Sequence, residues 1–193
     1  SYHALLVAPV GLRQGFRALV ERAVEHARAG RPARIIIKNN AVADQPTIKL
    51  LYRASQAGVP IDLIVRGVCC LRPGIPRVSD RIRVRSIVGR LLEHSRLYFF
   101  ENGGDPELYI GSADLMERNL DRRVEVLVPV LDPALRSHLR EVVLEALLKD
   151  TERAWLLTPG GTYERATAGD DKVDAQKSLI EWYAASARDE QSA

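Results

Sequence analysis

The chain has 193 residues, of which 46% are hydrophobic and 27% charged, and its formal net charge is +3. This length and composition predict one core-forming domain with an extension and exclude an array of three domains. No apolar run approaches the ~18 residues that a membrane span needs, so a transmembrane protein is excluded and a soluble one is expected.

The first residues of the chain and its cysteines indicate the same cellular setting. The first residues hold neither a basic stretch nor a long apolar run, so we expect no signal peptide, and the absence of an initial methionine suggests a piece excised from a longer protein. The only cysteines, Cys69 and Cys70, are adjacent, which disfavours a mutual disulfide and gives no metal-ligand spacing. These features predict a reducing, cytoplasmic setting and no metal site.

Arginine dominates the basic residues. There are 23 arginines and 5 lysines, and residues 61–100 hold eight arginines against three carboxylates, a local net charge of +5. The planar guanidinium grips phosphate oxygens in pairs. Although a GC-rich genome also enriches arginine, it does not explain the clustering, so we interpret the middle of the chain as an anion-binding region.

The first 66 residues alternate between β-prone runs and helical patterns. Residues 4–8, 34–38 and 59–65 are predicted strands, and apolar residues recur at helical spacing between them, up to Gly30 and Gly58. This alternation predicts a parallel sheet covered by helices. Because ligands gather where parallel strands end, we expect binding residues within residues 9–13, 38–40 and 66–67.

The second half is predicted to be richer in strands. A turn-rich loop at 71–76 precedes β-prone runs at 82–86, 96–100, 107–110 and 123–128, and Asn102-Gly103-Gly104 is typical of a hairpin. Apolar spacing predicts a helix over 135–149 and a weaker one over 172–187, with no structure predicted for 160–172. We therefore divide the chain into an α/β domain, residues 1–150, and a C-terminal extension, residues 151–193, which has one expected helix and a net charge of −3.

One group of residues predicts phosphoryl-transfer chemistry. His94 and Arg96 are two residues apart, so a strand would present both on one face. Ser112 lies in a small polar turn, and Arg66 follows a predicted strand. Phosphoryl transfer needs a proton donor or nucleophile whose pKa lies near neutral pH. It also needs fixed cations for the phosphate oxygens and hydroxyl or amide donors that hold the geometry. We predict that His94 is catalytic and that His94, Arg66, Arg96 and Ser112 contact phosphate.

The spacing of these residues resembles a known signature. The pattern His94-x-Arg96, followed after four residues by Glu101, and the turn Gly111-Ser112-Ala113-Asp114 resemble the phospholipase D superfamily. That signature has lysine, aspartate and asparagine where this chain has Arg96, Glu101 and Asp114.

A second, more specific resemblance covers residues 6 to about 130. Residues 64–76, 83–90, 92–96 and 119–125 closely resemble the last catalytic domain of the long-chain bacterial polyphosphate kinases. The chain departs from that family at Leu115 and Glu117, where the family usually has an aromatic residue and often a proline, and at Arg77, where a small residue is common. The resemblance implies an active-site tunnel between two phospholipase D-like domains, and the residues that line it are not predicted at these three places.

The resemblance implies a fold and an activity. The fold is an α/β, phospholipase D-like domain with a mixed, largely parallel sheet flanked by helices. The activity is reversible transfer of the terminal phosphate of ATP to inorganic polyphosphate, through a phosphohistidine in a preceding domain of the same polypeptide. His94 is expected to act as general acid or base, and Arg66 to bind the phosphates of ATP and polyphosphate.

The same resemblance implies partners for the chain. Magnesium is expected to arrive with ATP or ADP and to have its ligands outside this chain. The full-length enzyme is expected to be a cytoplasmic homo-oligomer that contains the upstream domains. The isolated chain is expected to be inactive, because the nucleophilic histidine belongs to the preceding domain.

Several further residues are weaker candidates. A solvated charged face or structural ion pairs explain them as well as contact with phosphate does; they are Arg83, Arg85, Arg90, Arg122 and Glu125. Glu101 and Glu125 either orient the histidine or an arginine, or form structural ion pairs. We interpret the other histidines, His3, His26 and His138, as surface or packing residues.

Two alternative functions remain open at this point. The first is a phospholipase D-like phosphodiesterase or nuclease, in which two copies of the chain pair to supply two histidines. The second is a non-enzymatic module that binds polyanions through the basic region, with a salt-dependent affinity.

Overall fold

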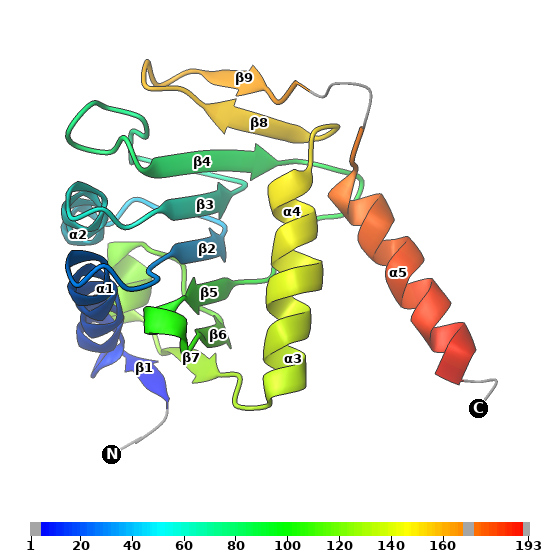
Figure 1. Ribbon diagram of the computed structural model, residues 1–193, viewed down its shortest axis with the longest axis horizontal. Helices are drawn as coiled ribbons and strands as arrows, with labels where there is room; N and C mark the ends of the chain where they lie inside the picture. The colour runs from blue at the N-terminus through cyan, green and yellow to red at the C-terminus, as the bar shows by residue number, and fades with distance from the viewer. Residues whose placement is uncertain (1–4, 168–171, 191–193) are drawn as a thin grey trace.

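The computed structural model describes residues 5–167 and 172–190, and its strands form one nine-stranded sheet in the order β1-β7-β6-β5-β2-β3-β4-β8-β9 (Figure 1). The strands are β1 (Leu6–Ala8), β2 (Ile35–Asn39), β3 (Ile61–Val65), β4 (Ile82–Ile87), β5 (Leu97–Phe100), β6 (Glu107–Gly111), β7 (Glu125–Pro129), β8 (Ala154–Leu157) and β9 (Tyr163–Arg165). The helices are α1 (Leu12–Arg28), α2 (Gln45–Gln56), α3 (Pro133–His138), α4 (Glu145–Lys149) and α5 (Ala175–Glu190), with shorter turns η1 (Asn102–Gly104), η2 (Arg118–Arg122) and η3 (Leu139–Leu144).

The middle of the sheet is formed by β2, β3 and β5, and every residue of these three strands is buried. Their β-branched and aromatic side chains suit a pleated surface that is covered on both sides. Full burial of one such side chain contributes about 1.5–3 kcal/mol to folding. These strands are therefore the rigid part on which a site can be built.

Helices cover both faces of the sheet. Ile35 and Ile37 pack in one apolar cluster with residues of α1 and α2, whereas Ile36, which points the other way, packs in a second cluster with Leu144 and Leu147. Residues 133–149 run as one continuous helix through α3, η3 and α4 over this second face. Figure 1 shows the strands between the α1–α2 pair and that helix.

The predicted α/β class and the mixed sheet flanked by helices are confirmed, but the sheet is less parallel than expected. Only the pairs β2–β3 and β3–β4 are parallel among the described strands. The first strand pairs antiparallel with β7 at one edge instead of joining the parallel strands. The strands from β5 to β7 also pair antiparallel, because short connections such as η1 reverse the chain without a crossover helix.

The C-terminal extension contains the expected helix, α5, and also two strands that the sequence did not predict. β8 pairs antiparallel with β4, and β9 pairs with β8, so the sheet continues past residue 150. Both strands are short and largely exposed, and Trp155 and Leu156 face outward in succession. No alternation of polar and apolar residues marks them, which is why the sequence pattern missed them.

No helix in the described ranges combines the length and the apolar character needed to cross a membrane. His3 lies outside the described residues. Cys69 and Cys70 are free thiols, and burial raises the pKa of the Cys69 thiol above its ordinary value.

Candidate active site

Three segments from separate parts of the chain meet at one edge of the sheet. Asn40 follows β2, Arg66 follows β3, and His94 precedes β5. Since β2 and β3 are parallel, with Asn39 opposite Val65, their carboxyl ends lie side by side. β5 runs antiparallel to β2, with Leu97 opposite Lys38, so the residues that precede β5 reach the same edge.

His94 lies between two guanidinium groups. Its Nδ1 is 2.8 Å from Nη2 of Arg66, and its Nε2 is 3.3 Å from Nη2 of Arg96. A neutral imidazole accepts a hydrogen bond at only one of its nitrogens. Guanidinium groups only donate, so the neutral ring can accept from Arg66 at Nδ1 or from Arg96 at Nε2, but not from both at once. His94 is exposed.

The Arg66 side chain is oriented by Asn40. Its Nε donates to Oδ1 of Asn40 at 2.6 Å, while Nη2 faces His94. Asn40 is buried, and both its backbone N–H and its side-chain amide donate to Oδ1 of Asp114, at 2.8 Å and 3.2 Å. Arg66 is thus held in one orientation by a buried amide that is itself fixed.

Asp114 holds the second arginine in a two-point contact. Nε and Nη2 of Arg96 donate to its two carboxylate oxygens at 3.0 Å and 3.1 Å. Burial alone would raise the pKa of Asp114, but the hydrogen bonds from Arg96 and Asn40 outweigh it, and the pKa lies below its ordinary value. Asp114 is therefore ionised at neutral pH and fixes the plane of the Arg96 guanidinium.

Lys38 supports the residues on either side of His94. This β2 residue is only 4% exposed, and its Nζ donates to the carbonyl of Ser95 at 2.9 Å and forms an ion pair with Glu93. Burial lowers the pKa of Lys38, which Glu93 opposes and the cations Arg66 and Arg96 reinforce. Burial would raise the pKa of Glu93, but the hydrogen bonds from Lys38 and Ser95 lower it. The charged pair anchors the chain next to the histidine.

Ser112 lies close to this centre without contacting His94. Its hydroxyl donates to the carboxylate of Glu125, which also accepts from Nδ2 of Asn119 at 2.7 Å. Ser112 and Arg96 line the same hollow, together with apolar residues of β6, β7 and η3. Ser112 and Glu125 therefore form a neighbouring polar pair, and Glu125 does not orient the histidine.

The expectation that His94 and Arg96 lie on a strand is wrong, because β5 begins at Leu97. Both residues belong to a loop, in which the Ser95 carbonyl accepts from the side chain of Lys38 and the Arg96 carbonyl accepts from the Gly111 N–H of β6 at 3.3 Å. The two side chains still meet, as the spacing predicted. Glu101 follows β5 and lies at its other end, so it cannot orient His94.

Four of the weaker candidates have other partners or places. Nε of Arg83 donates to Asp62, and Arg85 donates to the carbonyls of Leu147 and Asp150 at the end of α4. Arg122 pairs with Glu117, and Arg90 lines a surface hollow beside α5. The structure does not bring Arg83, Arg85, Arg90 or Arg122 into contact with His94. Arg83 and Arg85 are two residues apart on β4 and project from the same face of the sheet, whereas Arg90 and Arg122 lie outside β4.

The sequence did not single out Lys38, Glu93 or Asn40 individually as site residues. The strand-end rule did mark residues 38–40, and polar residues directly after three isoleucines were the available signal. Glu93 gave no signal, since its role depends on a lysine 55 residues earlier in the chain.

A metal does not fit this centre. No group of three or more histidine, cysteine, aspartate or glutamate side chains within 5–167 and 172–190 is arranged to hold an ion. Asp114 is already engaged by Arg96 and Asn40, and Glu93 by Lys38. The carboxylates of this centre are therefore occupied by other side chains and are not free to hold a metal.

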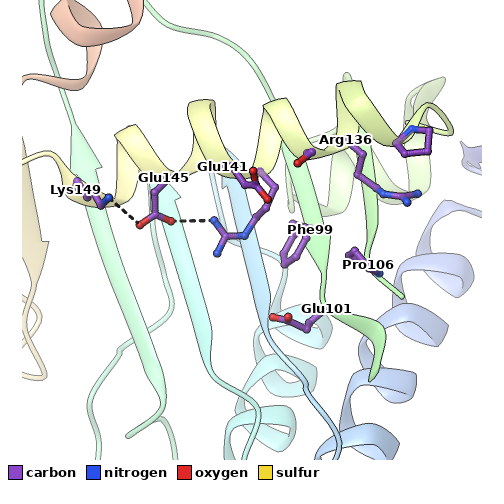
Figure 2. A pocket seen from close by; sticks show the side chains of 10 residues that line it. Phe99, Glu101, Pro106, Arg136, Glu141, Glu145 and Lys149 are labelled. Atoms are coloured by element: carbon purple, nitrogen blue, oxygen red, sulfur yellow. Dashed lines mark hydrogen bonds and ion pairs between the residues drawn. The ribbon is translucent and has the colours of Figure 1, made fainter. Parts of the chain in front are cut away.

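A second cluster of charges lies at the opposite end of β5 (Figure 2). A groove of about 530 Å³ lies there between the 133–149 helix and residues 99–106. Arg140 donates to Glu145 at 2.9 Å and lies over the ring of Phe99, and Lys149 also pairs with Glu145. The pairs formed by Arg140, Glu145 and Lys149 run along one helix, and no histidine lines the groove.

Comparison with known proteins gives one consistent result. Residues 5–176 match the family model described as polyphosphate kinase C-terminal domain 2. The chain is 60% identical over 165 residues to a polyphosphate kinase of Thermosynechococcus vestitus and 50% identical over 181 residues to one of Synechocystis, covering 86% and 93% of this chain. It spans only 22% and 25% of the length of those relatives.

A solved structure shows the same likeness in three dimensions. The crystal structure of polyphosphate kinase from Porphyromonas gingivalis aligns with a TM-score of 0.92 and 40% sequence identity, covering 96% of this chain and 28% of that one.

Proposed function

We propose a function from the premise that this chain belongs to the polyphosphate kinase family, whose C-terminal domain 2 matches residues 5–176. The function is reversible transfer of the terminal phosphate of ATP to inorganic polyphosphate, carried out by a longer polypeptide of which this chain is the C-terminal part. The observation that carries the proposal is the convergence of Arg66 and Arg96 on the two ring nitrogens of His94.

His94 acts as the proton donor and acceptor. When the terminal phosphate leaves ATP, the bond from phosphorus to the ADP oxygen breaks and a bond to a histidine nitrogen of the preceding domain forms. In its protonated form His94 passes a ring proton to the departing oxygen and becomes neutral, and in the reverse direction the neutral ring takes that proton back. The contacts of the two ring nitrogens with Arg66 and Arg96 support this assignment, because they keep the ring beside the two cations that would bind the phosphate.

Arg66 and Arg96 stabilise the charge of the transferring phosphate. Their guanidinium groups are fixed beforehand by Asn40 and Asp114, so little reorganisation is needed as negative charge develops on the phosphate oxygens. Magnesium supplies further charge neutralisation when it is bound with the nucleotide, and we place its ligands in the preceding domains.

The alternatives from the sequence have less support. Neither alternative, a homodimeric phosphodiesterase or a polyanion-binding module, explains why residues 5–176 resemble polyphosphate kinases. A binding module would also not require a histidine held between two arginines.

The decisive test replaces His94 in the full-length polypeptide. His94→Gln should lower kcat for polyphosphate synthesis by about 10²- to 10⁴-fold, the usual contribution of general acid–base catalysis. The matched control is His26→Gln on α1, whose Nε2 contacts Asn102 beyond the far end of β5; it should keep kcat within about twofold. A His94→Gln enzyme with the wild-type rate would overturn the proposal.

A further inference from the structure

The residues around His94 lie in a loop with no regular secondary structure. This segment, residues 88–96, joins β4 to β5 and is called the histidine loop below. Much of it is exposed, including Leu91 at 50% and Leu92 at 79%. A loop of this kind holds a side chain in place only if other parts of the molecule fix its backbone.

One of those fixing contacts comes from the C-terminal extension. Gln176, in the first turn of α5, forms two hydrogen bonds to the backbone of Leu91. The Leu91 N–H donates to Oε1 of Gln176 at 2.9 Å, and Nε2 of Gln176 donates to the Leu91 carbonyl at 2.9 Å. The side-chain amide thereby pairs with the loop as a neighbouring strand would, across 85 residues of sequence.

The histidine loop approaches Gln176 closely at Gly89. Gln176 is only 9% exposed, although α5 is otherwise a surface helix. A Cβ atom added at Gly89 would lie 2.4 Å from Oε1 of Gln176. The histidine loop therefore runs directly against the amide, and Gly89 permits this approach because it has no side chain.

A buried carboxylate fixes the backbone next to Gln176. Asp150 is 1% exposed and accepts hydrogen bonds from the backbone N–H groups of Arg153, Ala154 and Ala175, at 2.7 Å, 2.9 Å and 2.8 Å. It thus ties the end of α4, the start of β8 and the start of α5 together. The residue after Ala175 is Gln176, so the amide occupies a fixed place relative to the sheet.

We infer that Gln176 is a positioning residue, through which the C-terminal extension holds the histidine loop and sets the placement of His94. This inference rests on the proposed role of His94 in phosphate transfer. It gives the segment after residue 150 a part in the activity, although none of its residues that the structure describes, 151–167 and 172–190, contributes a side chain to the charged centre. Lys38 fixes the loop on the other side of Leu91, through Glu93 and Ser95.

The test is a double-mutant cycle in the full-length enzyme. Gln176→Ala alone should lower kcat by roughly tenfold, since small displacements of a catalytic group are costly, and should leave the KM for ATP within about twofold. In a His94→Gln background the same substitution should lower kcat no further, because the residue acts only through His94. Lys177→Ala, on the exposed neighbouring residue, is the matched control and should leave kcat unchanged.

A direct measurement keeps the inference testable if Gln176→Ala folds poorly. Gln176→Glu keeps an oxygen to accept from the Leu91 N–H but places a second oxygen against the Leu91 carbonyl, so it should lower kcat while the melting temperature stays near wild type. Hydrogen exchange at Leu91 should speed up in Gln176→Ala and not in Lys177→Ala.

The outcomes separate the two proposals. If His94→Gln keeps the wild-type rate, the proposed function fails. If His94→Gln is impaired while Gln176→Ala and Gln176→Glu keep the wild-type rate, only the positioning role fails. Equal losses from Gln176→Ala with and without His94 would mean that the residue stabilises the fold without positioning the histidine, and would also overturn the inference.

Discussion

The two ends of β5 both carry arginine and glutamate, yet only one resembles a catalytic centre. Before β5, Arg66 and Arg96 come from separate segments, and a buried acceptor at the edge of the central strands holds each of them. After β5, Arg140 lies on a helix and pairs with Glu145 five residues along. Convergence of cations from different strands, rather than their number, distinguishes a phosphate site from a charged surface.

The largest expected effect at the first cluster, apart from His94 itself, is that of Arg66→Lys. A lysine ammonium cannot contact Asn40 and His94 together in the geometry of a planar fork. Loss of a hydrogen bond to a charged group costs about 1.5–3 kcal/mol, so kcat/KM for ATP should fall about 10- to 100-fold. Steady-state kinetics of the full-length enzyme checks this, and an unchanged KM and kcat would argue against the role of Arg66.

Lys38→Met should have the next largest effect. The change removes the hydrogen bond to Ser95 and leaves the Glu93 carboxylate without its buried cation. We expect kcat to fall roughly tenfold and stability to fall by about 1–3 kcal/mol. Lys38→Arg, which retains a cation at this place, should recover part of the rate; if both variants behave like the wild type, the histidine loop does not need this anchor.

Acid should weaken both clusters, because the pKa of Asp114 in the first and of Glu145 in the second lie below their ordinary values. The pKa of Asp114 is lowered in the folded protein from the ordinary 3.8, so its contribution to stability is present above that value and is lost as the pH falls through the lower folded pKa. Asp114→Asn should flatten the dependence of unfolding free energy on pH between about pH 5 and pH 2. Urea unfolding over that range gives the comparison, and parallel curves for the two proteins would contradict it.

The smallest effect is expected at the second cluster. Arg140→Lys is the counterpart of Arg66→Lys at the other end of β5. It should keep kcat within about twofold and change stability by less than about 1 kcal/mol, because the substitution retains a cation opposite the half-buried Glu145. A loss of activity comparable to that of Arg66→Lys would remove the distinction between the two ends.

Much of the fold could be predicted from local patterns. The isoleucine run of β2, the 133–149 helix and the hairpin at Asn102 each carry a periodicity or a turn signal within a few residues. The direction of β1 could not be predicted, because its partner β7 lies more than 100 residues away in the sequence. A three-residue strand has too few side chains to indicate its neighbour.

The candidate site divides in the same way. His94 and Arg96 were predicted from their spacing in the motif, and Arg66 from its place at the end of a predicted strand. Lys38 and Gln176 act on backbone atoms of residues far along the chain, and no residue type at the partner position signals such a contact. These contacts with the loop backbone can be identified only in the folded structure, where the loop lies beside the residues that hold it.

The pairing of β4 with both β3 and β8 limits where the chain can be shortened. A protein ending at residue 150 would leave the outer side of β4 with a row of unpaired N–H and C=O groups. Such an edge invites pairing with other copies, so the shortened protein should aggregate when the protein that includes β8 and β9 does not. β8 and β9, which the sequence did not predict, therefore cover an edge of the sheet that would otherwise pair with other copies of the protein.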